Sequence, residues 1–170
     1  PQPAWIVCGV GTGGTSATIG RYLRYRWLES QLCVAEPSGS GFVQGWRSRD
    51  PRARATRPTL IEGIGRPGVE PGFVFDVVDT VIEVEDADSI AAAWWLEDLL
   101  GRRYGGSSGT NLVACLQLAA QMRVRGETGS IVTLLCDRGE RYAQTLFDRD
   151  WLAAHGIDPN RAQARLASRL

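Results

Sequence analysis

The sequence contains no lysine. Among its 170 residues, 19 are basic and 19 are acidic, so the formal net charge is zero, and every basic residue is an arginine. A chain without net positive charge lacks the basic surface that a dedicated nucleic-acid-binding protein usually has, so we expect no nucleic-acid partner. The absence of lysine also means that no side-chain amine is available to form a Schiff base.

Long apolar runs and clustered metal ligands are absent too. No apolar run approaches the length of a membrane span, so we expect no membrane association. The cysteines are far apart and His155 is the sole histidine, so we expect no metal site. We interpret His155 as a surface residue without a catalytic role, and most of the cysteines as small buried side chains in the reducing cytoplasm. The cysteines are Cys8, Cys33, Cys115 and Cys136.

Strand-like and helix-like segments alternate along the chain. This order predicts an α/β fold, a three-layer domain in which helices cover both faces of a mainly parallel sheet. We expect the domain over residues 1–150 and a C-terminal helical tail over residues 151–170. Residues 37–58 are rich in Gly, Ser, Pro and Arg, and we interpret them as a solvated, mobile surface loop. The expected strands are 4–10, 31–36, 80–84 and 130–136, and the expected helices are 16–28, 87–100 and 110–125.

A glycine-rich turn lies between the first expected strand and the first expected helix. It reads Gly9-Val10-Gly11-Thr12-Gly13-Gly14-Thr15. Glycines let successive backbone N–H groups converge on one anion, and the following helix adds its unpaired N–H groups and the positive end of its dipole. The turn therefore predicts a phosphate-binding cradle, and a tight turn without a ligand is the alternative.

The same glycines also match a dinucleotide-binding pattern. Gly9, Gly11 and Gly14 satisfy GxGxxG, and Glu36 ends the next strand, near where an acid that binds a ribose is expected. An NAD(P)-binding oxidoreductase domain is therefore a second hypothesis.

Four motifs, in order, resemble the cysteine synthase family of pyridoxal-phosphate enzymes of fold type II. The resemblance is closest to its L-cysteine desulfhydrase branch, judging by residues 16–22 and 61–67. The motifs are Gly11-Thr12-Gly13-Gly14-Thr15, Ile61-Glu62-Gly63-Ile64-Gly65, Gly106-Ser107-Ser108-Gly109 and Leu135-Cys136-Asp137-Arg138-Gly139-Glu140-Arg141-Tyr142.

The resemblance implies pyridoxal 5'-phosphate as cofactor and a cytoplasmic homodimer. It implies β-elimination on L-cysteine to sulfide, pyruvate and ammonia, with cysteine synthesis from an activated serine and sulfide as the alternative. Gly63, Ile64 and Gly65 would form the turn on the substrate side. The cofactor phosphate would be bound by Gly11, Thr12, Gly13, Gly14 and Thr15.

The chain departs from the family pattern in two ways. Cysteine synthases typically carry a serine where this sequence has Arg138, so we expect Cys136, two residues earlier, to face the pyridine ring and Arg138 to face solvent. An inert buried thiol is the alternative for Cys136. In the family, the catalytic lysine and an asparagine loop for the substrate lie upstream of the phosphate loop. We therefore expect this chain to be a C-terminal half without catalytic residues, inactive alone; a non-catalytic fragment is a further alternative.

Overall fold

Four short apolar segments form one parallel sheet in residues 2–168, the part of the chain that the computed structural model describes. They are β1 (Trp5–Cys8), β2 (Gln31–Pro37), β3 (Thr80–Val84) and β4 (Ile131–Thr133). The strand order is β3-β2-β1-β4, and each neighbouring pair is parallel. Because β1 is internal and parallel to its neighbours, the turn that follows it lies at the carboxyl edge of the sheet, where α/β folds place ligands.

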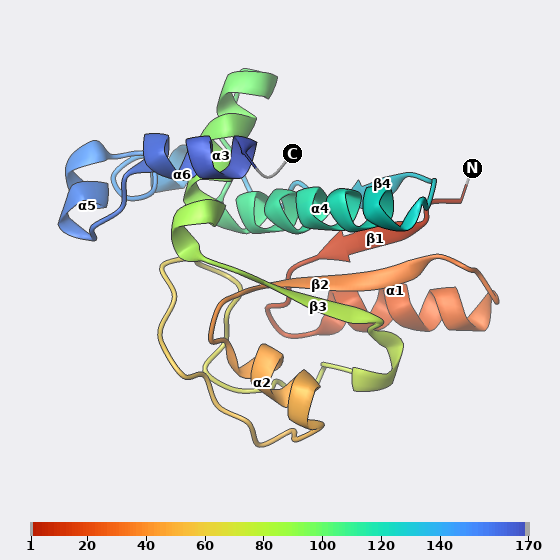
Figure 1. Ribbon diagram of the computed structural model, residues 1–170. Helices are drawn as coiled ribbons and strands as arrows, with labels where there is room; N and C mark the ends of the chain where they lie inside the picture. The colour runs from red at the N-terminus through yellow and green to blue at the C-terminus, as the bar shows by residue number, and fades with distance from the viewer. Residues whose placement is uncertain (1, 169–170) are drawn as a thin grey trace.

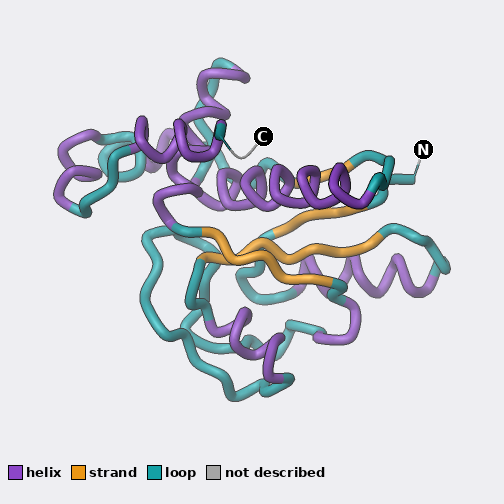
Figure 2. Tube along the Cα trace, viewed as in Figure 1, coloured by secondary structure: helices purple, strands orange, loops and turns teal. Residues whose placement is uncertain are grey.

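Helices cover both faces of this sheet (Figures 1 and 2). On one face lie α1 (Gly14–Tyr25) and α2 (Gly41–Ser48). On the other lies α4 (Gly106–Arg125), which contacts all four strands; α3 (Asp86–Leu100) crosses α4 near its first turn. The prediction of a three-layer α/β fold with a parallel sheet is confirmed.

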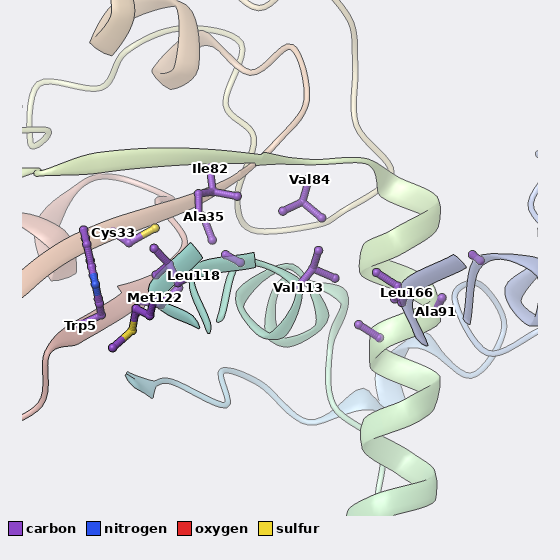
Figure 3. Packing of buried hydrophobic residues seen from close by; sticks show 14 residues of the cluster. Trp5, Cys33, Ala35, Ile82, Val84, Ala91, Val113, Leu118, Met122 and Leu166 are labelled. Carbon is purple, nitrogen blue, oxygen red and sulfur yellow. The ribbon is translucent and has the colours of Figure 1, made fainter. Parts of the chain in front are cut away.

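Side chains along β2 alternate between two of the three clusters of buried side chains in residues 2–168. Cys33 and Ala35 belong to the cluster beneath α4, whereas Leu32 and Val34 belong to the cluster beside α1. A strand that is apolar on both faces is what a central strand of a covered parallel sheet requires. The α4 side, drawn in Figure 3, is completed by Trp5, Val7, Ile82, Val84, Ala91, Ala92, Val113, Ala114, Leu118, Met122, Ala162 and Leu166.

The interpretation of residues 37–58 as a solvated, mobile loop is wrong for residues 37–48, whereas residues 49–58 form no helix or strand and are mostly exposed. The segment contains α2, whose start is capped by Ser40: the Ser40 hydroxyl accepts a hydrogen bond from Val43 N at 3.3 Å. Phe42 is fully buried in the second cluster. Residues that favour turns dominate the composition of this segment. The fully buried side chains of Phe42 and Val43 nevertheless pack this segment against the rest of the protein as a helix.

Several element boundaries differ from expectation. Strand β1 ends at Cys8 rather than 10, and α1 spans 14–25 rather than 16–28. Helix α4 begins at Gly106 rather than 110, so the Ser-Ser-Gly segment is its first turn. Strand β4 ends at Thr133 rather than 136, because the chain then leaves the sheet and bonds to α4: Asn111 Nδ2 donates to Leu134 O at 3.0 Å. The single helix expected over 151–170 is two, α5 (Arg149–Ala154) and α6 (Pro159–Ala167), and residues 169–170 of that tail lie outside the described residues.

Candidate functional site

The glycine-rich turn is held open by close backbone contacts. Gly13 has φ of +90°, and a Cβ there would overlap the backbone N of Phe73. A Cβ on Gly11 would lie 2.7 Å from the carbonyl oxygen of Gly63. Larger residues would therefore displace the turn from the segments beneath and beside it.

The first N–H groups of α1 face no internal acceptor. The helix has no side chain capping its start and no acidic residue in its first turn. Its first internal bond runs from Ala17 N to Gly13 O, and among the described residues no acceptor is found for the N–H groups of Gly14 and Thr15. Unpaired N–H groups at a helix start, together with the helix dipole, attract an anion.

These groups line a cavity of about 290 Å³. A Cβ on Gly14 would meet only Thr12 Oγ1, at 3.9 Å, so the space beside Gly14 is open. Arg66 is the single ionisable side chain in the cavity wall. The wall is formed by Gly9, Val10, Gly11, Thr12, Gly13, Gly14, Thr15, Ser16, Gly63 and Arg66. All five predicted phosphate-binding residues thus lie together around one cavity.

The carboxyl group of Glu36 connects two backbone segments next to this cavity. The residue is fully buried at the end of β2. Its Oε1 accepts a hydrogen bond from Val10 N at 2.7 Å, and its Oε2 accepts one from Gly65 N at 3.2 Å. Burial raises the pKa of Glu36 to about 8. The carboxyl group therefore joins the glycine-rich turn to the 63–65 turn and does not line the cavity, so the expected role in binding a ribose is wrong.

A second cavity of about 350 Å³ adjoins the first. Gly9 and Gly63 belong to the walls of both cavities. The wall of the second cavity also contains Ile64, so two residues of the predicted substrate-side turn, Gly63 and Ile64, line this cavity. Gly65 does not line it; its N–H donates to Glu36 Oε2. The remaining members of this wall are Glu62, Ser107, Cys136, Asp137, Arg141 and Tyr142.

Cys136 lies in the second cavity and Arg138 does not. Ser108 Oγ accepts a hydrogen bond from Cys136 N at 2.9 Å, and Asn111 Nδ2 lies 3.6 Å from Cys136 Sγ. The side chain is exposed rather than buried, so the interpretation of cysteines as buried residues fits Cys8 and Cys33 but not Cys136. Whether its thiol faces a pyridine ring stays a prediction.

The sequence alone assigned no role to three polar residues near Cys136, namely Asn111, Asp137 and Tyr142. Tyr142 Oη donates to Asp137 Oδ2 at 2.7 Å, and burial together with this carboxylate raises the pKa of Tyr142. Asp137 Oδ1 and Asn111 Oδ1 are buried without a hydrogen-bond partner among the described residues. Buried acceptors without a partner are costly, so these two oxygens are unusual features of the segment that holds Cys136. The strand-end position of Asp137 was the available signal.

Features of other site classes were not found in the described part of the chain. Residues 2–168 contain no group of three or more His, Cys, Asp or Glu side chains arranged to hold a metal ion. In that same range, no helix is long and apolar enough to cross a membrane. His155 is exposed, its ring centroid lies 3.9 Å from that of Trp151, and it lines neither cavity.

Comparisons with known proteins find the family that the sequence motifs resemble. The family model described as "Pyridoxal-phosphate dependent enzyme" matches residues 1–137. L-cysteine desulfhydrase Cds1 of Mycobacterium tuberculosis (strain ATCC 25177 / H37Ra) is 52% identical over 94% of this chain and 43% of its own length. Cysteine synthase 2 of Schizosaccharomyces pombe is 32% identical over 91% and 41%. The crystal structure of O-acetyl serine sulfhydrylase isoform 3 from Entamoeba histolytica matches with a TM-score of 0.77 at 28% identity, covering 99% of this chain and 46% of that one. The chain thus spans less than half the length of these relatives.

Proposed function

Because the chain belongs to the family of pyridoxal-phosphate dependent enzymes, we propose that it carries the cofactor-phosphate half of an L-cysteine desulfhydrase. Such an enzyme eliminates sulfide from L-cysteine and yields pyruvate and ammonia. The observation that carries the choice of reaction is the 52% identity to a named desulfhydrase over 94% of this chain. The resemblance to the cysteine synthase family is confirmed, and the NAD(P)-binding hypothesis is wrong.

The first cavity fits a phosphate monoester. Its wall offers unpaired N–H groups at the start of α1, the hydroxyls of Thr12 and Thr15, and one positive side chain. We assign Gly11, Thr12, Gly13, Gly14 and Thr15 to the phosphate. When bound, pyridoxal phosphate supplies an electron sink for negative charge at the α-carbon of an amino acid.

The second cavity is the proposed place for the ring. Cys136 lines its wall, and we assign the Cys136 thiol to the pyridine nitrogen. Tyr142 holds the neighbouring Asp137 carboxylate through its hydroxyl, and Ser108 holds the backbone of Cys136. The turn at Gly63 separates the two cavities and is our assignment for the substrate side.

The amine that must react with the cofactor is not among these 170 residues, since they include no lysine. The residues described above therefore bind and orient, and we propose no proton transfer by any of them. The activity of the whole protein depends on groups outside this sequence.

The test is a product assay on the full-length protein. With L-cysteine as the single substrate, we expect equal amounts of sulfide and pyruvate. If O-acetylserine with sulfide gives cysteine at a higher rate, cysteine synthesis is the function, which the similarity to cysteine synthase 2 favours as the second candidate. If neither reaction occurs and no cofactor binds, the proposed function is wrong.

Gly14→Val is the matched binding variant. A Cβ at Gly14 would meet only Thr12 Oγ1, at 3.9 Å, so we expect the fold to tolerate the substitution, whose side chain would occupy the space beside the unpaired N–H groups. We expect the variant to lose binding of pyridoxal phosphate by about 100-fold or more while its Tm stays within a few degrees of the wild type. Equilibrium titration and thermal unfolding measure the two quantities. Unchanged binding would remove the loop assignment.

The control is Thr18→Ala, on an exposed face of the same helix and outside the cavity wall. It should leave both binding and Tm unchanged.

A further inference from the structure

Arg66 differs from half of the arginines in the described part of the chain in having no ion-pair partner. Nine arginines of residues 2–168 form ion pairs with carboxylates. For the Arg66 side chain, the described residues provide neither an ion pair nor a hydrogen bond, and the residue is exposed at the wall of the 290 Å³ cavity. The Arg66 guanidinium therefore has its N–H groups available for a ligand in this cavity.

The backbone of Arg66 is fixed on both sides. Its carbonyl oxygen accepts a hydrogen bond from Gly41 N at 3.0 Å, at the first residue of α2. The preceding residue, Gly65, donates its N–H to Glu36 Oε2. The other oxygen of the same carboxyl group holds Val10 of the phosphate turn. The base of Arg66 and the phosphate turn are therefore positioned by one shared group.

Arg66 is the one positively charged side chain in the wall of this cavity. The other wall residues contribute backbone N–H groups and neutral hydroxyls, and no other charged side chain. A phosphate monoester carries close to two negative charges near neutral pH. Arginine binds phosphate through two parallel N–H groups, and a charge-assisted bond of this kind is stronger than a neutral one.

We propose that the guanidinium of Arg66 is a direct ligand of the cofactor phosphate, adding a formal positive charge to a cradle that is otherwise built from backbone. The inference rests on the proposed function, because it concerns the same site. It makes Arg66 a binding residue outside the glycine-rich motif, delivered to the cavity by the 63–65 turn. Since burial raises the pKa of Glu36 to about 8, the shared carboxyl group is largely neutral near pH 7 and does not cancel this charge.

The experiment compares the full-length wild type with Arg66→Gln, Arg66→Lys and Arg21→Gln. Arg21 is an exposed arginine of α1 outside the cavity wall, so its variant removes one positive charge without touching the cradle. The probes are pyridoxal phosphate and, on the cofactor-free protein, inorganic phosphate alone. The readouts are equilibrium affinity and the 31P NMR pH titration of bound phosphate, with thermal unfolding as the check on folding.

We expect Arg66→Gln to weaken the binding of both probes by about tenfold, Arg66→Lys to recover part of the loss, and Arg21→Gln to match the wild type. The second pKa of bound phosphate should be higher in Arg66→Gln, because a nearby cation stabilises the dianion. If Arg66→Gln binds both probes as the wild type does, or loses affinity for pyridoxal phosphate alone, this inference is overturned and the proposed function stands. A wild type that binds neither probe overturns both.

Discussion

Glu36 shows how a single residue sets the shape of the site. An acid at the end of an apolar strand looks like a surface residue or a ligand-binding group, but here it is fully buried and accepts two backbone N–H groups from separate turns. No arginine pairs with it among the described residues. Burial without a cation explains why its pKa is raised to about 8.

This raised pKa makes stability depend on pH in a definite direction. The folded protein holds the Glu36 proton more tightly than the unfolded chain, in which glutamate titrates near 4.5. Its contribution to stability is therefore complete below pH 4.5 and is lost as the pH rises through about 8. The slope between these values is at most about 1.4 kcal/mol per pH unit for one proton.

Glu36→Gln should remove this slope. Glutamine cannot ionise, but it loses one acceptor and should cost about 1 kcal/mol at pH 5, where the wild-type carboxyl group is protonated. Urea unfolding at pH 5, 6, 7 and 8 should show the free energy of unfolding falling more steeply with pH in the wild type than in the variant. Glu29→Gln, at an exposed position, should keep the wild-type slope. Equal slopes in the wild type and Glu36→Gln would contradict the raised pKa.

At the scale of elements, the close packing of α3 on α4 decides the position of the wall of the second cavity. Gly109, in the first turn of α4, faces the backbone of α3, and a Cβ there would overlap the carbonyl oxygen of Ser89. The same first turn carries Ser108, which holds Cys136. A shift of α4 away from α3 would therefore also move Cys136.

Gly109→Ala should destabilise the protein although alanine favours helices. The gain in helix propensity is about 1 kcal/mol, whereas forcing a methyl group against backbone atoms costs about 1–3 kcal/mol or more, since the backbone of α3 cannot rotate away. We expect a net loss of about 2 kcal/mol, measured by urea unfolding. Ala119→Gly, at an exposed position of α4, is the control for propensity alone and should lose about 1 kcal/mol. Stabilisation by Gly109→Ala would show that the two helices are less tightly packed than described.

For the molecule as a whole, the absence of lysine means that this chain contributes binding groups to the proposed enzyme but no reactive side-chain amine. This chain forms the cavity lined by residues 11–15 and the cavity adjoining it, but its 170 residues include no side-chain amine. When the full-length protein is loaded with pyridoxal phosphate, reduced with borohydride and digested, we expect the pyridoxyl group on no side chain of residues 1–170. Mass spectrometry of the peptides measures this. Labelling of a peptide outside the range is the positive control, and a labelled side chain within it would contradict this expectation.

Local patterns were sufficient for the architecture and for the cradle. The alternation of apolar strands and amphipathic helices predicted the parallel sheet, because each period dictates which face is buried. The run of glycines after β1 predicted an open turn before α1, because closely spaced glycines allow the backbone conformations that such a turn requires. Residues 11–15 therefore lie around one cavity as expected.

What the sequence left open was decided by contacts between distant segments. The burial of Glu36 depends on turns 26 and 29 residues away, and α2 depends on a core that its own polar composition does not reveal. The second cavity joins residues from the 62–64 turn, the start of α4 and the segment after β4. Strand and helix periods say which residues face inward, but only the folded chain determines which of them meet.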